Sequence, residues 1–326
     1  MANIYVTRRI PEKGLKMLKE KFGKFEMNEE DRVLTREELL EKVKGRDAVL
    51  SLLTDTVDDE VLAAAGPQCK IFSNYAVGFN NFDLAAGTKH GIMMTNTPGV
   101  LTDTTADFAI ALMFACARRT VEGDKFMREG KYKGWGPMLM LGKEITGKTL
   151  GIMGAGRIGG NIAVKMAKGF GMKVLYIDRS GKPELENEIS AKKVDIETLC
   201  GESDYISINL NYTPETHHLI NENLLGLMKK DAILVNTARG QIIDEKALVK
   251  HLKAVPTFQA GLDVFENEPA MEQGLTELDN VILAPHVGSA TIETREKMAV
   301  IAAQNIIDAL EGRTPEFVVN PEVLNK

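Results

Sequence analysis

The chain has 326 residues, of which 44% are hydrophobic and 26% are charged. This length and apolar content predict two ordinary domains, each with a core of its own. The net charge of -6 arises from charges of both signs interspersed along the chain, a pattern that argues against a basic stripe for nucleic acid or a polybasic patch for a membrane. We therefore expect the ligands to be small molecules.

The cysteines and the apolar runs indicate in which cellular compartment the protein works. Cys69, Cys116 and Cys200 are far apart, odd in number and without metal-like spacing to the five histidines, which predicts buried thiols and no metal site. The longest apolar run, 108–117, is too short to span a bilayer, and the first nine residues lack a signal-peptide core. The sequence thus predicts a cytoplasmic protein.

Short β-like runs alternate with helical patterns through the first hundred residues, which predicts a parallel α/β unit. The expected strands are Ile4–Val6, Ala48–Leu53, Lys70–Asn74 and Ile92–Asn96. The expected helices are Gly14–Lys24, Arg36–Val43, Glu60–Ala65 and Asp83–Lys89.

A long helix is expected over Thr104–Arg119, followed by a glycine-rich loop that carries the only tryptophan, Trp135. A second series of strands then predicts another doubly wound sheet, with strands at Leu150–Met153, Lys173–Ile177, Tyr205–Leu210, Ala232–Asn236, Gln259–Val264 and Val281–Ala284. The last expected helix is Thr291–Gly312. If it packs back on the first unit, a discontinuous substrate domain, 1–100 with 288–326, surrounds a nucleotide domain, 101–287, with a cleft between them.

Three glycines between an apolar run and a helical pattern indicate a dinucleotide site. Gly154 permits a tight strand-to-helix turn, Gly156 lets backbone N–H groups approach a pyrophosphate, and Gly159 lets the helix pack close to the sheet. Asp178 ends the next apolar run, where a carboxylate can accept hydrogen bonds from an adenosine ribose. A tight turn without a ligand is the plain alternative for the glycines alone.

The charge of Asp178 bears on the choice between NAD and NADP. A 2′-phosphate beside this carboxylate would be repelled by about 4 kcal/mol for unit charges about 4 Å apart at an effective dielectric of about 20. This favours NAD. Arg157 and Arg179 are close in sequence and could offset part of the repulsion, so NADP stays open.

Polar side chains follow three strands of the second series. Arg239 follows the strand that ends at Asn236. The next strand is followed by Asp263, Glu266 and Glu268, and the last strand is followed by His286. Because ligands of open α/β sheets bind beyond the carboxyl ends of the strands, these residues could converge on a cofactor. Each alone is equally typical of a surface or turn residue.

The set suits hydride transfer to a 2-oxo acid. Arg239 can hold the substrate carboxylate with two parallel hydrogen bonds. His286 can donate a proton to the carbonyl oxygen, and Glu268 beside it would fix the imidazole tautomer and favour its charged form.

Four segments resemble successive signatures of the D-isomer-specific 2-hydroxyacid dehydrogenases, and the resemblance extends over nearly the whole chain. They are Gly154–Gly159, Asn236–Gly240, Leu262–Pro269 and Pro285–Thr291. The resemblance implies a flavodoxin-like substrate domain, a Rossmann NAD-binding domain and a homodimer. It also implies that Arg239, Glu268 and His286 are catalytic and that the N–H groups of Val77 and Gly78 hold the substrate carboxylate. The residues that it places along the cofactor are Thr104, Arg157, Ile158, Asp178, Thr237, Asp263 and His286.

Within that family, the segments Ser51–Asp55 and Trp135–Gly142 are most similar to glyoxylate and hydroxypyruvate reductases, which implies that Leu53 and Trp135 contact the substrate. An interface or core-capping role is the alternative for Trp135. Asn80 and the pair Asn211-Tyr212 depart from the usual family pattern, so substrate preference is less constrained than the chemistry. D-lactate or D-3-phosphoglycerate dehydrogenase activity and a dinucleotide-sensing, corepressor-like role are the other interpretations.

Overall fold

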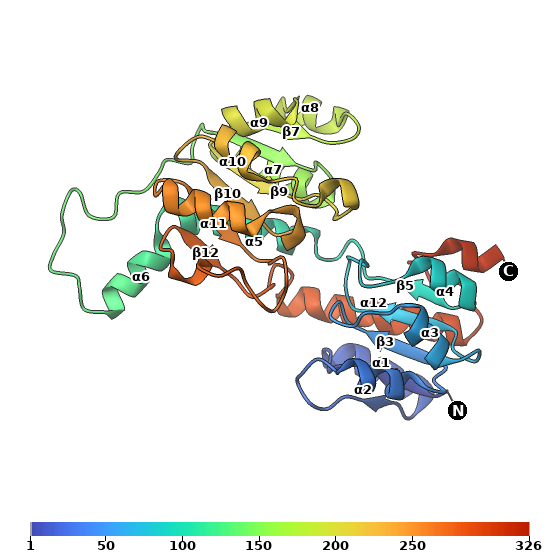
Figure 1. The fold of residues 1–326 in the computed structure, drawn as a ribbon. Helices are drawn as coiled ribbons and strands as arrows, with labels where there is room; N and C mark the ends of the chain where they lie inside the picture. The colour runs from blue at the N-terminus through green and yellow to red at the C-terminus, as the bar shows by residue number, and fades with distance from the viewer. Residues whose placement is uncertain (1, 326) are drawn as a thin grey trace. The chain divides into compact units, whose positions relative to one another are not determined.

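The computed structural model describes residues 2–325 and divides them into two compact units. One unit contains the residues up to Leu101 and from Ala290 onward, and the other contains Thr102–Ser289. Each unit is built on a parallel sheet with helices on both faces, which confirms the α/β class expected from the sequence. Figure 1 shows the elements of both units along the chain.

The first unit has a five-stranded sheet in the order β2-β1-β3-β4-β5. Its strands are β1 (Ile4–Val6), β2 (Glu26–Met27), β3 (Ala48–Ser51), β4 (Ile71–Asn74) and β5 (Met93–Thr95). Its helices are α1 (Glu12–Phe22), α2 (Arg36–Val43), α3 (Asp59–Ala65), α4 (Leu84–His90) and α12 (Ile292–Leu310), with a short 3-10 turn, η4 (Pro321–Asn325). Sequence reasoning missed β2, because two partly exposed residues carry no alternation that predicts a strand.

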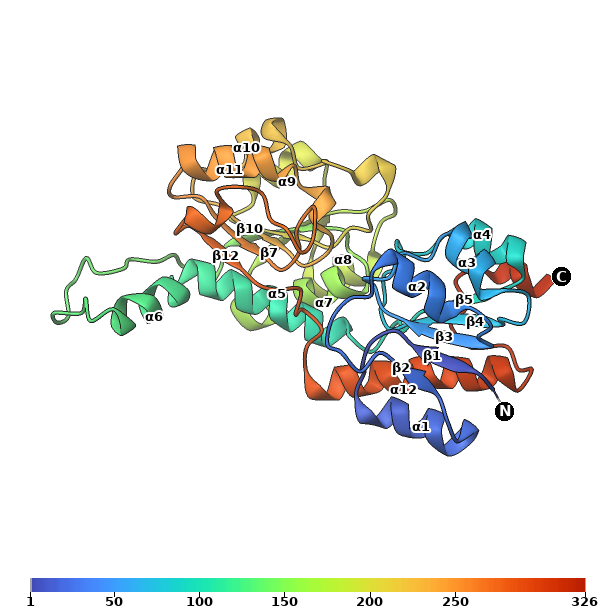
Figure 2. The ribbon, with the colours of Figure 1, turned by 60° about the horizontal axis from the view of Figure 1, so that its bottom comes forward.

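Helices cover both faces of this first sheet. Figure 2 shows α1 and α12 together on one face and α2, α3 and α4 on the other. Each layer has its own core: Leu18 and Ile306 lie in the first, and Val61 and Phe72 in the second. The return of α12 to this sheet therefore completes the apolar layer on the face that it shares with α1.

The second unit has a seven-stranded sheet in the order β12-β11-β10-β9-β6-β7-β8. Its strands are β6 (Thr149–Met153), β7 (Lys173–Ile177), β8 (Lys192–Lys193), β9 (Tyr205–Ile208), β10 (Ile233–Asn236), β11 (Gln259–Leu262) and β12 (Val281–Leu283). Its helices are α5 (Thr102–Ala117), α6 (Thr120–Arg128), α7 (Arg157–Phe170), α8 (Pro183–Ile189), α9 (Ile196–Glu202), α10 (Glu222–Leu227) and α11 (Glu245–Ala254). Three 3-10 turns complete it: η1 (Pro214–Thr216), η2 (Gly240–Ile242) and η3 (Leu275–Glu277).

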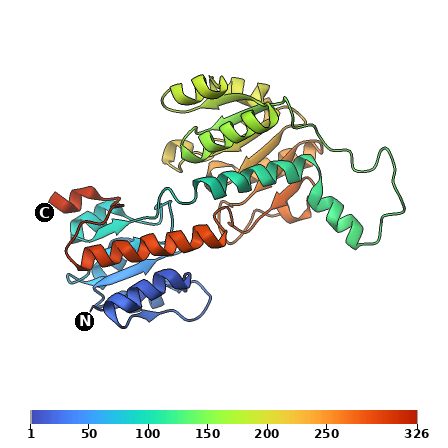
Figure 3. The same cartoon turned by 180° about the vertical axis from the view of Figure 1, so that it is seen from behind.

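The strand order of the second sheet reverses between β6 and β9. Helices α5 and α7 lie side by side on one face, as Figure 3 shows, and α9, α10 and α11 pack on the other. In open α/β sheets the ligand binds at such a reversal, beyond the carboxyl ends of the strands. The loop after β6 is therefore the place to look for a bound nucleotide.

The segment after α5 differs from expectation. Arg119 takes a left-handed conformation, with φ of 51°, which ends α5, and the chain then forms a second helix, α6, where a loop was predicted. The loop comes only after α6, and it runs clear of the rest of its own unit in Figures 1 and 3. Trp135, which lies in this loop, is 83% exposed. Within residues 2–325, no helix is both long and apolar enough to cross a membrane.

The packing of α7 on the second sheet gives a test of this fold. A Cβ at Gly159 would lie 2.1 Å from the backbone oxygen of Gly154, whereas a Cβ at Gly169 of the same helix would meet nothing within 4 Å. We expect Gly159→Ala to lower the free energy of unfolding by about 2 kcal/mol or more. Gly169→Ala, the control, should raise it by up to about 1 kcal/mol. Denaturant unfolding measures both, and equal effects would contradict the close packing.

Candidate active site

The glycine loop joins β6 to α7 at the point where the strand order reverses. Gly154 has φ of 90°, and its N–H donates to the backbone oxygen of Ile177 at 2.9 Å, so the turn itself requires glycine here. Gly159 is required by the close approach of α7 to the strand. Two of the three glycines are thus explained by the fold alone.

Gly156 is not explained by the fold. It is the N-cap of α7, it has a negative φ of -77°, and a Cβ added to it would meet nothing within 4 Å. Arg157 and Ile158 follow in the first turn of α7, where backbone N–H groups have no helical acceptor. A bare backbone at a helix N-terminus fits the pyrophosphate of a dinucleotide.

A second observation at the same end of the sheet also fits a bound cofactor. The hydroxyl of Thr237, just beyond β10, is buried and has no hydrogen-bond partner among residues 2–325. A buried, unpaired hydroxyl is costly unless a ligand or water satisfies it. The residues present therefore fit a dinucleotide that lies across the carboxyl ends of β6 and β10.

Asp178 follows β7, as expected for a residue that binds the adenosine ribose. Its Oδ1 accepts a hydrogen bond from the N–H of Ser180 at 3.3 Å and lies 3.3 Å from Nζ of Lys182. The backbone of Lys182 is itself fixed, because its N–H donates to the hydroxyl of the buried Tyr176 at 2.7 Å. Sequence reasoning considered Arg157 and Arg179 as nearby cations but missed Lys182.

Arg239, Glu268 and His286 come from the loops after three neighbouring strands, β10, β11 and β12. Arg239 is half-buried, and its Nη1 donates to the backbone oxygen of Ala238 at 2.7 Å. Burial lowers the pKa of its guanidinium and the nearby charge of Glu268 opposes that change. An arginine stays protonated under such conditions, so a fixed positive charge lies beside the Glu268 carboxylate.

Glu268 and His286 form a hydrogen-bonded pair. Nδ1 of His286 lies 2.9 Å from Oε2 of Glu268, and Oε1 of Glu268 accepts from the N–H of Phe265 at 3.0 Å. The other ring nitrogen of His286, Nε2, has no hydrogen-bond partner within residues 2–325. A carboxylate on Nδ1 holds the proton at that nitrogen and leaves Nε2 for exchange with a substrate.

The electrostatics keep Glu268 charged. Burial alone would raise the pKa of its carboxyl, but the hydrogen bond and charge of His286 lower it, and the N–H of Phe265 and the charge of Arg239 add to that effect. The net result is a pKa below the ordinary value of 4.5. The pairing of Glu268 therefore contributes stability above that value and loses it as the pH falls through the lowered pKa.

Asp263 holds the turn that presents His286. Its side chain is 1% exposed, and its two carboxylate oxygens accept from the N–H groups of Val287 and Gly288, each at 2.7 Å. The N–H of His286 donates to the Asp263 backbone oxygen at 2.9 Å. With these bonds His286 keeps a left-handed φ of 54°, which is unusual for a residue with a side chain. Sequence reasoning placed Asp263 against the cofactor and missed that its carboxylate holds this turn.

The loops of Arg239 and Glu268 touch through their backbones. A Cβ at Gly240 would lie 1.9 Å from the carbonyl carbon of Phe265, so only glycine fits after Arg239. Nε2 of Gln241 donates to the backbone oxygen of Glu266 at 2.7 Å. The sequence showed that a glycine follows Arg239, but no pattern in the sequence identified Gln241 as a link between the two loops.

The substrate-binding residues expected in the first unit lie on two loops held by buried amides. Asn96 donates to the backbone oxygen of Val77 at 2.7 Å, and Asn74 donates to that of Gly78 at 3.1 Å. The N–H groups of Val77 and Gly78 themselves donate no hydrogen bond within residues 2–325. The expected anion-binding donors are therefore free, and their carbonyl groups are fixed.

The loop that contains Leu53 is held in a similar way. The buried carboxylate of Asp55 accepts from the N–H of Leu52 at 2.8 Å, and Asn81 donates to the backbone oxygens of Leu52 and Asp55. Leu53 itself is half-buried. These bonds fix the backbone on both sides of the residue expected to contact the substrate.

The remaining expected residues lie on other elements of the second unit. Thr104 is half-buried in the first turn of α5, and Trp135 is exposed in the loop that follows α6. His218 forms a 2.7 Å contact from Nε2 to Oε1 of Glu266 and stacks on His217 with ring centroids 4.0 Å apart. No group of three or more potential metal ligands occurs within residues 2–325.

Comparison with known proteins identifies the family of the chain. Residues 110–288 match the family model described as the D-isomer specific 2-hydroxyacid dehydrogenase, NAD binding domain. A glyoxylate reductase of Thermococcus litoralis is 52% identical over 98% of this chain and 97% of its own length.

Solved structures match over the same extent. The crystal structure of the TT0316 protein from Thermus thermophilus is similar with a TM-score of 0.90 and 42% identity over 97% of this chain and 99% of that chain. An NADPH-dependent glyoxylate/hydroxypyruvate reductase from Sinorhizobium meliloti, solved with NADP and malonate, has a TM-score of 0.83 and 28% identity over 99% and 97% of the two chains. The chain belongs to the D-isomer-specific 2-hydroxyacid dehydrogenases, enzymes that use a nicotinamide cofactor.

Proposed function

We propose that this enzyme reduces glyoxylate or hydroxypyruvate to the corresponding 2-hydroxy acid, with His286 as the proton donor. The observation that carries the proposal is the 2.9 Å contact between Nδ1 of His286 and Glu268, made beside the charge of Arg239 and with Nε2 left open. The 52% identity to a glyoxylate reductase supports the same substrate class. The nicotinamide cofactor supplies the hydride when it is bound.

Arg239 is proposed to bind the substrate carboxylate. Its planar guanidinium can make two parallel hydrogen bonds to that group, and its charge polarises the adjacent carbonyl. The free N–H groups of Val77 and Gly78 are proposed to bind substrate, so the first unit serves as the substrate domain and the second as the nucleotide domain.

His286 is proposed to give its proton to the carbonyl oxygen as that oxygen becomes an alkoxide. Glu268 stabilises the imidazolium before the transfer, and in the reverse direction it fixes the neutral ring so that Nε2 acts as the base. The lowered pKa of Glu268 keeps this carboxylate charged through the neutral range.

Asp178 supports a preference for NADH, but Lys182 lessens it. The ammonium lies 3.3 Å from Oδ1 of Asp178, so part of the repulsion toward a 2′-phosphate is cancelled at this site. We propose that the enzyme prefers NADH and also accepts NADPH.

Two further properties are proposed here. The loop beyond α6 exposes Trp135, Met138 and Leu141, an apolar set that supports burial in a homodimer and a role for Trp135 at the partner's active site. All three cysteines are buried and free, which supports a reducing compartment such as the cytoplasm.

The function is tested with a panel of oxo acids. We expect the purified enzyme to oxidise NADH with glyoxylate and hydroxypyruvate faster than with pyruvate or 3-phosphohydroxypyruvate, because the chain is 52% identical to a glyoxylate reductase. The measurement is the loss of absorbance of the reduced cofactor, giving kcat/KM for each acid. A preference for pyruvate or the phosphorylated acid would assign a different substrate.

The acid–base pair is tested by substitution. His286→Ala should lower kcat about 100- to 10,000-fold, because the proton donor is lost, while the Kd for NADH stays close to that of the wild type. Glu268→Gln should also lower kcat, and it should remove the acid limb that we expect for the wild type below pH 4.5, since no carboxylate remains to be protonated there. His90→Ala, a change at the last residue of α4, is the control. Turnover retained by His286→Ala would remove His286 from proton transfer.

Cofactor choice is tested at Asp178 and Lys182. Asp178→Ser should raise the kcat/KM ratio of NADPH to NADH, because it removes a charge of the same sign as the 2′-phosphate. Lys182→Gln should lower that ratio by about tenfold, because the charge of Asp178 is then no longer offset by the ammonium. Lys173→Gln, at the opposite end of β7, is the matched control and should leave the ratio unchanged. An unchanged ratio in both test variants would exclude this pair as the selector.

A further inference from the structure

Glu245 is a buried carboxylate that the proposed reaction does not use. It is the first residue of α11, it is 2% exposed, and Asp244 caps the helix before it. A buried glutamate is rare unless its oxygens are engaged. Its presence therefore calls for a partner that offsets the loss of hydration.

The partners of Glu245 are backbone groups of the Glu268 loop. Oε1 accepts from the N–H of Glu266 at 2.8 Å, and Oε2 accepts from the N–H of Glu272 at 3.1 Å. These two donors stand on either side of Glu268 in the sequence. One carboxylate thus fastens both ends of the segment 266–272 to the start of α11.

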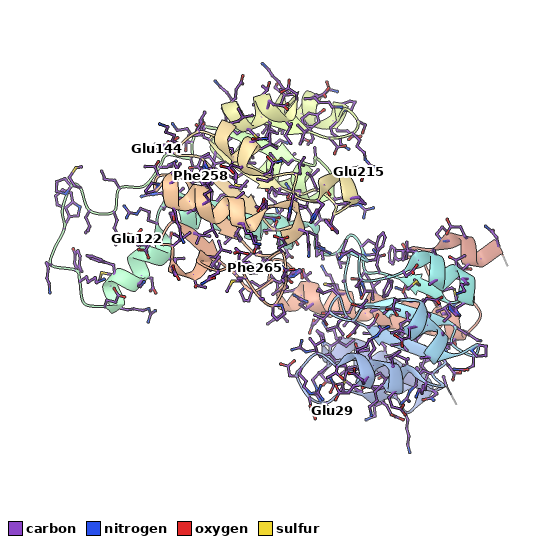
Figure 4. The ribbon with its side chains drawn as sticks, viewed as in Figure 1. Glu29, Glu122, Glu144, Glu215, Phe258 and Phe265 are labelled. Carbon is purple, nitrogen blue, oxygen red and sulfur yellow. The ribbon has the colours of Figure 1, made fainter. Side chains whose placement is uncertain are left out.

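The same segment is held from a second direction. Gln241 donates to the backbone oxygen of Glu266, and the backbone of Gly240 packs directly against Phe265. Phe265, labelled in Figure 4, directly precedes the segment, and its N–H donates to Oε1 of Glu268. The peptide that joins Phe265 to Glu266 is therefore fixed on one side by the loop of Arg239 and on the other by Glu245.

We propose that Glu245 is a positioning residue, which holds segment 266–272 so that Glu268 faces His286. The inference rests on the proposed roles of Glu268 and His286. Two backbone N–H donors, one to each side-chain oxygen, require a group with two acceptors, so a carboxylate suits the place and an amide does not. The side-chain amide of a glutamine would set an NH₂ group against one of the two N–H groups.

The charges around both carboxylates define what a pH profile would report. Glu245 faces the carboxylates of Glu266 and Glu272, and burial raises the pKa of its carboxyl. Glu268 faces His286, Arg239 and Asp263. A loosened segment would cost Glu268 its bonds from His286 and Phe265, so the pKa of Glu268 would rise.

The test is Glu245→Gln, with Glu222→Gln as the matched control. Glu222 is likewise the first residue of a helix after a capping residue, Asn221, but it is exposed and its carboxylate pairs with Lys250 at 2.6 Å. We expect Glu245→Gln to lower kcat about 10- to 100-fold, as a displaced catalytic group does. The acid limb of kcat/KM should move upward by about half a pH unit or more. The Kd for NADH should stay within about twofold of the wild type, and the control should change none of these.

A double-mutant cycle separates positioning from a general loss of structure. In a Glu268→Gln background, Glu245→Gln should lower kcat by no more than about a further twofold, because it acts through Glu268. A further 10- to 100-fold loss of kcat in that background would overturn the proposal. So would an acid limb of kcat/KM that does not move in the single variant Glu245→Gln.

Backbone hydrogen exchange supplies a readout that needs no turnover and no variant. In the wild type, the N–H groups of Glu266 and Glu272 should exchange much more slowly than an unprotected loop. Exchange at the rate of an open loop would overturn the proposal even if Glu245→Gln fails to fold. Slow exchange in a protein that reduces no oxo acid would support the anchor and contradict the proposed function, so the two failures are distinct.

Discussion

The hydrogen bond between Nδ1 of His286 and Glu268 is the interaction on which the candidate site depends. It sets the tautomer of the imidazole, it leaves Nε2 open, and it keeps a charged carboxylate half-buried near Arg239. A buried carboxylate without such partners would be protonated, and an imidazole without the carboxylate would turn freely. The proposed proton transfer therefore needs both residues.

Much of the surrounding structure holds the backbone that carries this pair. Asp263 fastens the turn of His286, and the backbone contact at Gly240 joins the loops of Arg239 and Glu268. Glu245 holds the Glu268 loop from the opposite side. Three strands deliver these loops to one edge of the sheet, because the carboxyl ends of parallel strands meet there. The site is thus a product of the strand order as much as of its three polar side chains.

The sequence predicted the α/β class and the glycine loop because both depend on local patterns: alternating apolar runs and a residue type that a turn requires. It did not predict β2, β8 or α6, since strands of two residues have too few positions to show a period and the left-handed turn at Arg119 has no signature. The roles of Asp263, Gln241, Glu245 and Lys182 were hidden for another reason. Their hydrogen bonds and ion pairs join or orient loops in space. The identity of a polar residue in the sequence does not show whether its side chain is buried or which group it contacts.

The most direct test of the central claim is a crystal structure of the enzyme with a nicotinamide cofactor and oxamate, an analogue of a 2-oxo acid that is not reduced. We expect Nε2 of His286 to lie about 3 Å from the carbonyl oxygen of oxamate, with the guanidinium of Arg239 on the carboxylate. A ligand whose carbonyl oxygen faces another residue, with Nε2 of His286 turned away from it, would contradict the account.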